Sequence, residues 1–448
     1  MRILLVSPNT LTVPYPVYPL GLDYVAGSVA PKHQIRNADL NVVTDEEFDE
    51  ILNEHEPDII GISCRNIDNT EAGDPLFFIR EYSEFVQGLK KKTDALIVCG
   101  GAGFTILPEA VFQALDADYG IIGEGERFGL LVEALDKGRD VVDIPGLMTR
   151  NALGVEPKPW QGTTTRVVNS NTDHFGFYLQ KGGMLNLQTK RGCSFNCIYC
   201  PYPHIEGRKH RFFSPSEVAA TALALQAGGA KYFFITDSAF NSNVDHSLQV
   251  AAALQQAGVT IPWGGFFAPL KLPSDYFVKM AAAGLSHVEF GTESMSGQML
   301  KTYCKPFRPF DVVAAHQQAV DAGLHVAHYF LMGGPGESAE TVSESLQEIE
   351  QLPKAVFFFF MGIRIYPHTG IHDIALKEGK ISGSTDLLQP VFYHPDRIDP
   401  AAIEQFVREQ ARDRLNWIIG SGGADIASTV ERMYAKGFTG PLWEYLIS

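Results

Sequence analysis

Short apolar segments alternate with longer segments of helical periodicity along most of this chain. The first part contains five short apolar segments that we expect to be strands: Arg2–Ser7, Ile35–Asp39, Asp58–Ser63, Ala95–Cys99 and Tyr119–Gly123. Strands that alternate with helices predict a parallel, doubly wound sheet. Ligands of such sheets bind beyond the carboxyl ends of the strands.

The turns after these strands are rich in small and polar residues, which suits a ligand that approaches the backbone closely. The residues that we expect at this ligand are Ser7, Asn9, Ser63, Cys64, Arg65, Asn66, Gly100, Gly101, Gly123, Glu124, Gly125 and Glu126.

A second alternating series follows a segment rich in Pro, Gly, Asn and Thr, between about Lys137 and Gly183, which predicts a linker. Its expected strands are Met184–Thr189, Lys231–Thr236, Ile261–Phe266, His287–Gly291, His325–Met332 and Ala355–Ile363. Its expected helices are Pro215–Ala227, Val244–Ala257, Ser274–Ala283, Phe310–Ala322 and Ala339–Leu352. Regular βα repeats predict a partial barrel with its active site at the carboxyl ends of the strands. Two further helices are expected in the tail, at Pro400–Gly420 and Ala424–Lys436, as a lid or a packing element.

The predicted fold class is therefore α/β with four parts. We expect an N-terminal doubly wound, Rossmann-like sheet over residues 1–138 and a linker over residues 139–183. A partial (β/α)6 barrel of the TIM type follows over residues 184–370, and a small, mainly helical C-terminal extension over residues 371–448.

Composition excludes several classes of protein. A net charge of −16 opposes a nucleic-acid partner, because binding to phosphates needs a basic surface. The most apolar stretch, Ala355–Ile365, is too short to span a membrane and contains Arg364. The N-terminus has no signal-peptide pattern, and the six cysteines form no disulfide framework. We expect a cytoplasmic protein.

Three of the six cysteines, Cys193, Cys197 and Cys200, follow the first barrel strand at C-x3-C-x2-C spacing. An iron–sulfur cubane normally takes four cysteine ligands, so three leave one iron open to another ligand. A structural zinc site closed by His204 or His210 and a closed electron-transfer cluster are the alternatives. No second CxxC pair exists to favour zinc.

The motif C-x3-C-x-aromatic-C after the first strand of a βα series resembles the radical SAM superfamily. The resemblance implies that the three cysteines hold a [4Fe–4S] cluster whose open iron chelates S-adenosylmethionine (SAM), with Tyr199 beside the adenine. Reduction of the cluster then cleaves SAM to methionine and a 5′-deoxyadenosyl radical. It also implies an electron donor, either a reductase or a flavodoxin or ferredoxin.

Two barrel segments fit this resemblance through acidic and hydroxyl side chains. After the second strand, Asp237 stands where the family often has Gly-Gly-Glu, and its carboxylate suits the SAM ammonium. After the fourth strand, Glu293 and Ser294 suit the ribose and the methionine carboxylate. The alternative for Ser294 or Ser296 is a helix cap.

Two more segments reach the same end of the barrel. Gly333 and Gly334 after the fifth strand permit close backbone approach to the adenine, although a tight turn before a helix is the alternative. Arg364 at the sixth strand is expected to anchor a carboxylate rather than to stay a solvated charge.

The glycine-rich N-terminal sheet before such a barrel resembles the cobalamin-binding subgroup of the superfamily. Ser63 is then expected near the base of the cobalamin tail, and Arg65 or Asn66 below the cobalt. The D-x-H-x-x-G motif of cobalamin mutases is absent, since Asp39–Thr44 lacks a histidine, so no histidine ligand for cobalt is expected. A flavodoxin-like structural domain with no cofactor, or with a nucleotide, is the alternative.

The predicted function is that of a cobalamin-dependent radical SAM enzyme. We expect a methyltransferase that uses methylcobalamin and a 5′-deoxyadenosyl radical to methylate an unactivated carbon of a small or lipid-like substrate. The alternatives are a cyclisation, ring-contraction or rearrangement enzyme and a noncatalytic iron–sulfur or cobalamin carrier. Fold and cofactor motifs do not specify the substrate.

Several other residues have simpler interpretations. Cys304 is expected to be a plain, partly buried thiol, and His325 and His328 to be hydrogen-bonded core histidines rather than bases. The run Phe357–Phe360 is expected to fill the barrel core, and an apolar substrate pocket is its alternative use.

Overall fold

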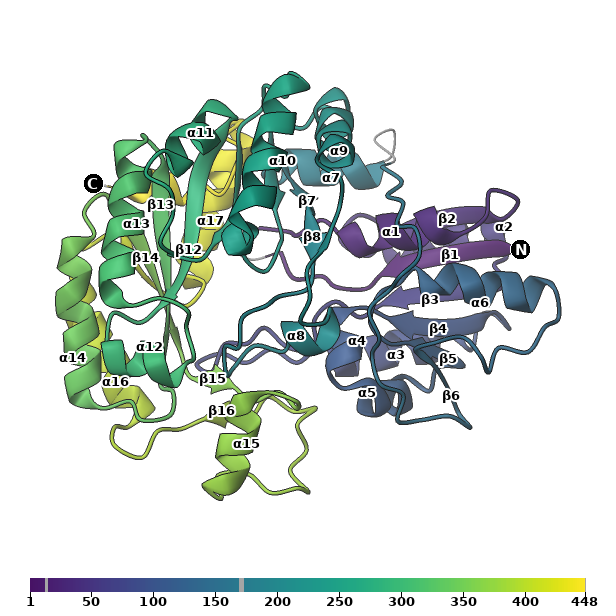
Figure 1. The fold of residues 1–448 in the computed structure, drawn as a ribbon. Coiled ribbons are helices and arrows are strands. Elements are labelled where there is room, and N and C mark those ends of the chain that lie inside the picture. The colour runs from purple at the N-terminus through teal and green to yellow at the C-terminus, as the bar shows by residue number, and fades with distance from the viewer. Residues whose placement is uncertain (13–14, 169–172, 448) are drawn as a thin grey trace.

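The computed structural model describes residues 1–12, 15–168 and 173–447, which form two α/β units (Figure 1). The N-terminal unit contains β1 (Arg2–Ser7), α1 (Leu20–Ser28), β2 (Gln34–Asp39), α2 (Asp45–His55), β3 (Ile59–Ser63), α3 (Ile79–Leu89), β4 (Leu96–Gly100), α4 (Ala102–Ile106), α5 (Pro108–Leu115), β5 (Tyr119–Ile121), α6 (Arg127–Asp136) and β6 (Leu147–Thr149). Its strand order is β2-β1-β3-β4-β5-β6, parallel except for β6. All five predicted strands are confirmed, and the strand order reverses between β1 and β3, where such sheets bind ligands.

The second unit is an open, parallel barrel, as predicted. Its sheet has the order β17-β14-β13-β12-β11-β10-β7. The elements to Thr302 are α7 (Asp173–Gln180), β7 (Met184–Leu187), β8 (Lys190–Arg191), α8 (Tyr202–Ile205), β9 (Arg211–Phe212), α9 (Pro215–Ala227), β10 (Tyr232–Ile235), η1 (Phe240–Ser242), α10 (Val244–Gln256), β11 (Trp263–Phe267), α11 (Tyr276–Ala282), β12 (Leu285–Glu293) and α12 (Gly297–Thr302). The remaining elements are α13 (Pro309–Asp321), β13 (His325–Met332), α14 (Ala339–Glu348), η2 (Ile349–Gln351), β14 (Ala355–Met361), β15 (Ile363–Arg364), α15 (Gly370–Lys377), β16 (Phe392–Tyr393), α16 (Pro400–Ala411), β17 (Trp417–Ile419), α17 (Gly423–Ala435) and η3 (Trp443–Leu446).

The tail differs from the prediction. The helix expected over Pro400–Gly420 ends at Ala411, and the residues after it form β17, which pairs parallel with β14 and becomes a seventh strand of the barrel sheet. Three strand residues are too short a run to show a period of two. The tail is therefore part of the barrel rather than only a helical extension.

The segment expected to be a linker also contains regular structure. Within residues 139–183, β6 adds an antiparallel edge to the N-terminal sheet and α7 leads into the barrel. Residues 169–172 of this segment lie outside the part that the structure describes. Both elements are short, so their formation depends on tertiary contacts rather than on a periodicity that the sequence could reveal.

The phenylalanine run on β14 has one residue on each face of the sheet in turn, because side chains alternate along a strand. Phe357 and Phe359 are buried in the main core under the helices. Phe358 and Phe360 point to the other face, into the barrel, and are half-buried. The run therefore supplies both the core and an apolar lining of the barrel interior.

Buried polar contacts join the two units. The Arg364 guanidinium lies 2.8 Å from the Asp68 carboxylate, and the Tyr178 hydroxyl donates to Asp39 at 2.7 Å. Among the described residues, no helix is long and apolar enough to cross a bilayer.

Candidate active site

The cysteine loop leaves the barrel sheet after β7 and β8 and ends in the short helix α8, which lies between the two units (Figure 1). Its backbone is held by hydrogen bonds from Gly192 to the Glu206 carboxylate at 2.9 Å and from Cys193 to the Gly207 carbonyl at 3.1 Å. Gly192 has a φ of +84°, and a Cβ atom there would collide with the carbonyl of Lys209. Only glycine fits this entry to the loop.

We expect Gly192→Ala to displace the loop and to lower iron incorporation during anaerobic reconstitution to below about half of the wild-type value, since both the φ and the approach of the Lys209 backbone exclude a side chain. Iron and sulfide analysis measures the effect. The matched control is Gly297→Ala, because the Cβ position of this helical glycine meets no atom within 4 Å. Normal iron content in Gly192→Ala would contradict the loop geometry.

The three thiols share one electrostatic environment. Burial, together with the neighbouring thiols Cys197 and Cys193, raises the pKa of Cys200 to about 12, while Lys305 acts in the opposite direction. Burial also raises the pKa of Cys197, against the effect of Lys305. A buried cation beside three cysteines suits ligands that must bind as thiolates.

Lys305 belongs to a cluster with Tyr199 and Glu293 beside the cysteine loop. Its ammonium lies 2.9 Å from Oε1 of Glu293 and 3.1 Å from the Tyr199 hydroxyl, which itself donates to Glu293. The side chains of Lys305 and Glu293 are only 7% and 13% exposed. Oε2 of Glu293 is buried and has no hydrogen-bond partner among the described residues.

This unpaired acceptor can receive a hydroxyl group, because burial without a partner is costly. An unpaired carboxylate oxygen is compatible with the predicted position of Glu293 near the ribose of SAM. Lys305 was not among the predicted site residues, although it follows Cys304 directly and pairs with Glu293 at the end of β12. Cys304 itself is exposed, rather than partly buried as expected.

Asp237 is buried at the same end of the barrel, but its carboxylate already has partners. Oδ1 accepts from the Thr189 backbone at 2.8 Å, and Oδ2 lies 2.9 Å from the Lys190 ammonium. Lys190 therefore occupies the place that we expected a ligand ammonium to take. A role of Asp237 toward SAM stays a prediction.

Arg364 does anchor a carboxylate, but the carboxylate belongs to the protein. Its Nε donates to Asp68, and both terminal nitrogens donate to carbonyls, those of Ile365 and Leu387 at 2.7 Å each. Arg364 therefore lies in the junction of the two units, and its nitrogens donate to protein groups rather than to a ligand at the barrel mouth.

Ser294, Gly333 and Gly334 lie at the carboxyl ends of β12 and β13. The Ser294 hydroxyl accepts from the backbone of Ser296 at 3.0 Å, and Ser296, the N-cap residue of α12, makes no side-chain capping bond, so the cap alternative is wrong for these two serines. Gly333 has a φ of +93°, and its backbone donates to Glu337 at 3.2 Å. A side chain at Gly334 would collide with the Tyr303 ring. Their contacts with SAM stay predictions.

A cavity of about 410 Å³ opens between the two units. One part runs along the sheet face of β1, β3 and β4 beneath α1, and its lining is mainly apolar. The other part reaches the barrel mouth at Asn186, Thr236 and Phe266. The predicted residues that line it are Ser63, Arg65, Gly100, Gly101, Gly123, Glu124, Gly125 and Glu126. The cavity therefore joins the expected ligand end of the sheet to the barrel.

Two glycines that line this cavity are required by the packing of the protein around them. A Cβ atom at Gly101, whose φ is +108°, would lie 2.8 Å from the Cys64 carbonyl oxygen. A Cβ atom at Gly125 would lie 2.6 Å from the Val25 side chain. The two carboxylates of the same turn face the barrel instead, since Glu126 lies 2.7 Å from Arg191 and Glu124 pairs with Arg211.

Arg65 lines the cavity, and its guanidinium is held by polar neighbours. It donates to the side chains of Asn66 at 2.7 Å and Asn9 at 3.2 Å, and to the Val17 carbonyl at 3.1 Å. Burial lowers the pKa of Arg65. Asn9 and Asn66 thus act through Arg65 rather than as lining residues.

Ser7 and Cys64 do not line the cavity either. Both are buried, and Cys64 belongs to the core on the opposite face of the sheet. No histidine lines the cavity within the described part of the chain, and the group that faces the cobalt stays a prediction.

Family models match both units. The radical SAM superfamily model matches residues 187–349, and the B12 binding domain model matches residues 6–130. The chain belongs to the cobalamin-binding radical SAM enzymes. The cofactors of these enzymes are a [4Fe–4S] cluster, SAM and cobalamin.

This radical SAM enzyme is similar to named methyltransferases and to a solved structure. It is 24% identical to tryptophan 2-C-methyltransferase of Streptomyces laurentii, over 82% of this chain and 73% of the relative. It is 24% identical to cytidylyl-2-hydroxyethylphosphonate methyltransferase of Streptomyces wedmorensis, over 80% and 78% of the two chains. The methyltransferase TsrM of Kitasatospora setae, solved with cobalamin and a [4Fe–4S] cluster, matches with a TM-score of 0.86 at 20% identity, over 99% and 96% of the chains. This likeness shows that the fold is shared.

The residues of this radical SAM enzyme fit its cofactors. The three-cysteine loop with buried Lys190 and Lys305 nearby suits an anionic cluster, and the unpaired oxygen of Glu293 suits a ligand hydroxyl. The glycine-lined, largely apolar part of the cavity suits a planar base and its tail. His204 and His210, the zinc ligands of the alternative, have other partners, since His204 stacks on His368 at 4.1 Å and His210 lies 3.2 Å from Ser242.

Proposed function

We propose that this enzyme transfers a methyl group from SAM, by way of cobalamin, to a carbon of a small apolar or aromatic molecule. The observation that carries the proposal is the single cavity that links the B12-binding sheet to the mouth of the radical SAM barrel. Bound cobalamin supplies a methyl carrier, and the reduced cluster with SAM supplies a carbon-centred radical. The chain's own residues hold these groups against one another and exclude water.

The barrel interior supports an aromatic or apolar substrate. The ring of Tyr329 stacks on Phe358 with centroids 4.8 Å apart, and Phe266 lies edge-on to Tyr329 at 6.3 Å. Phe266 is 39% exposed, although it lies within β11, and it also lines the cavity. Exposed aromatic rings inside a barrel mouth are suited to flat, weakly polar ligands.

We also propose an electron donor, a small reductase or a flavodoxin- or ferredoxin-type protein, because the cluster must be reduced. An oxygen-sensitive cluster and six cysteines that are all free suit the reducing cytoplasm. The net charge of −16 supports a small molecule rather than a nucleic acid as substrate.

The test is anaerobic turnover of the reconstituted enzyme with SAM labelled in its methyl group. A panel of small aromatic compounds serves as substrate and includes tryptophan, which is bound in the similar TsrM structure. We expect S-adenosylhomocysteine, 5′-deoxyadenosine with the labelled methionine released beside it, and one labelled methylated product. If 5′-deoxyadenosine forms without any methylated product, a cyclisation or rearrangement replaces the methyl transfer. If SAM is not cleaved at all under dithionite, the protein is a carrier.

Phe266→Ala tests the place of the substrate. Loss of one aromatic contact of about 1.4 kcal/mol lowers kcat/KM about tenfold, mainly through KM. Formation of 5′-deoxyadenosine without substrate should stay at the wild-type rate, because the residue does not lie in the cysteine loop. The matched control is Phe310→Ala, a ring 64% exposed on the outer helix α13, which should change neither quantity. If Phe266→Ala and Phe310→Ala had the same kcat/KM, the proposal that the substrate contacts Phe266 on β11 would be contradicted.

A further inference from the structure

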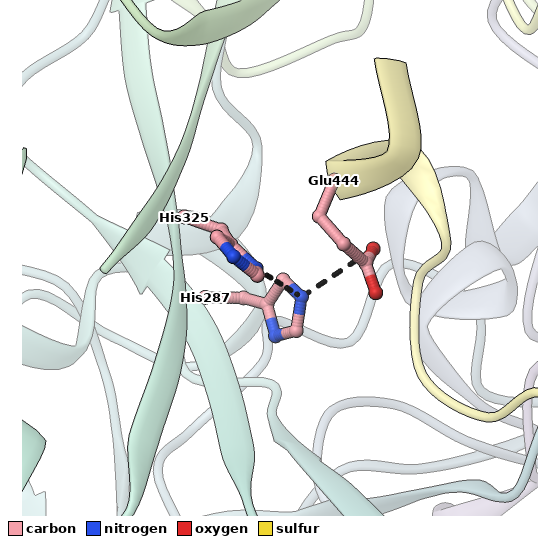
Figure 2. Close-up of side chains that lie close together, drawn as sticks. All are labelled: His287, His325 and Glu444. Carbon is pink, nitrogen blue, oxygen red and sulfur yellow. Dashed lines mark hydrogen bonds and ion pairs between the residues drawn. The ribbon is translucent and has the colours of Figure 1, made fainter. Parts of the chain in front are cut away.

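Two histidines and one glutamate meet at the end of the barrel opposite to the cysteine loop. His287 and His325 stand at the beginnings of β12 and β13, where they are paired in register, and Glu444 comes from η3 at the C-terminus (Figure 2). Nε2 of His287 lies 3.4 Å from Nδ1 of His325 and 3.4 Å from Oε2 of Glu444. The three ligand atoms lie within 4.8 Å of one another.

Ser286 contacts one ring nitrogen of His287. The Ser286 hydroxyl lies 2.7 Å from Nδ1 of His287 and 3.2 Å from the Trp263 carbonyl oxygen. When the hydroxyl donates to Trp263 and accepts from Nδ1, the neutral ring keeps a lone pair on Nε2, and this lone pair faces His325 and Glu444.

A carboxylate oxygen and an imidazole lone pair that face each other repel unless a cation lies between them. Oε2 of Glu444 is buried and makes no hydrogen bond among the described residues. No lysine or arginine pairs with Glu444 in the described part of the chain, and its recorded ion-pair partner is His287 itself. The cluster lacks a positive charge at its centre.

The spacing is that of a metal site rather than of a short ionic hydrogen bond. Zinc binds nitrogen and oxygen ligands at about 2.0–2.1 Å with tetrahedral angles, which puts neighbouring ligand atoms about 3.3–3.4 Å apart. An ionic hydrogen bond has its heavy atoms about 2.7–2.9 Å apart. The two separations of 3.4 Å, from Nε2 of His287 to Nδ1 of His325 and to Oε2 of Glu444, match the zinc geometry.

We propose that His287, His325 and Glu444 bind a zinc ion, with a fourth position open to water. Two imidazoles and one carboxylate form a ligand set that zinc accepts readily. Ser286 is the outer-shell partner that orients His287. The site lies at the amino ends of the strands, the end associated with stability rather than with catalysis in such barrels.

The zinc would fasten the C-terminal segment to the barrel floor. Trp443, the residue before Glu444, donates its indole N–H to the buried carboxylate of Glu289 at 3.0 Å, and Glu289 also accepts from the Tyr329 hydroxyl at 2.9 Å. Tyr329 belongs to the aromatic lining described above. The metal therefore supports the floor beneath the substrate site, and only this last consequence rests on the proposed function.

A second group of three candidate ligands provides a matched comparison. His33, Glu133 and Asp136 also lie within ligand distance of one another. Lys32 lies 3.0 Å from Glu133 and 2.6 Å from Asp136, and the N-terminal amino group lies 3.0 Å from His33. Because these ammonium groups already supply the positive charge, we expect no metal there.

Equilibrium dialysis against radioactive zinc at buffered, micromolar free concentration tests the proposal. The holoenzyme carries its reconstituted cluster, so that the three cysteines are occupied, and iron analysis verifies this in every variant. We expect one zinc per chain, at least about a 100-fold loss of affinity in His287→Gln and in Glu444→Gln, and about a tenfold loss in Ser286→Ala. Glu133→Gln, the matched control, should bind zinc as the wild type does.

Thermal unfolding gives a second readout that does not depend on activity. Zinc should raise the Tm of the wild type and of Glu133→Gln but not that of Glu444→Gln, since a ligand stabilises only the state that binds it. Wild-type protein that takes up no zinc, or His287→Gln that takes up as much as the wild type, would overturn the site. Neither result would bear on the methyltransferase proposal, because that proposal is tested by SAM turnover.

Discussion

Cys197→Ala is expected to abolish SAM cleavage and methyl transfer together, with a residual rate below about one thousandth of the wild-type rate. We expect the three cysteines of the loop to be the cluster ligands, because they lie in the segment that the radical SAM model matches, and an alanine at one of them then leaves an iron without a protein ligand. Burial raises the pKa of Cys197 and of Cys200, and Lys305 acts in the opposite direction at both thiols.

Anaerobic reconstitution followed by iron analysis and product assays measures this effect. Cys304→Ala is the matched control, because Cys304 is exposed and its sulfur contacts only the carbonyl of Thr302, at 3.8 Å. It should keep the full cluster and full activity. A Cys304→Ala variant as inactive as Cys197→Ala would show that the loop cysteines do not account for the activity.

Lys305→Met is expected to destabilise the protein by about 3–5 kcal/mol, because it leaves the Glu293 carboxylate buried without its cation. One oxygen of Glu293 already lacks a hydrogen-bond partner among the described residues, and the other would keep only the Tyr199 hydroxyl. The penalty is the cost of an uncompensated buried charge rather than of one lost contact.

The midpoint of denaturant unfolding, compared at equal slope, measures the loss. The double variant Lys305→Met with Glu293→Gln removes the charge as well and should recover most of the stability. Glutamine keeps the shape of the side chain at a position whose φ is +60°, so it adds no new backbone strain. If the double variant is as unstable as Lys305→Met alone, packing around Lys305, and not charge, stabilises this corner of the site.

The alternation of strands and helices was enough to predict both units, because buried parallel strands are continuous apolar runs that stand out between amphipathic helices. All predicted barrel strands are present, several with identical or nearly identical bounds, such as His325–Met332. The strand β17 was missed because Trp417–Ile419 is short and follows a helix, and only its pairing with β14 makes it a strand.

The cysteines could be predicted from spacing alone, since their chemistry depends on one contiguous loop. The charged partners could not, because each pair joins residues far apart in the sequence. Arg364 is close to the predicted barrel mouth, yet its partner Asp68 comes from the other unit. Asp237 follows β10 as predicted, but Lys190 of β8 forms an ion pair with it. The sequence can therefore predict at which end of a sheet a charged group lies. It does not show which group of opposite charge pairs with it there.

The central claim is that one cavity serves SAM and cobalamin together in methyl transfer. The most direct measurement is anaerobic turnover with SAM that carries a trideuterated methyl group, in the presence of the small-molecule fraction of the native host, with and without added cobalamin. We predict that a metabolite other than methionine carries the trideuterated methyl group and accumulates together with S-adenosylhomocysteine, and only when cobalamin is present. Such a metabolite formed equally fast without cobalamin, or 5′-deoxyadenosine with methionine as the sole labelled metabolite, would contradict it.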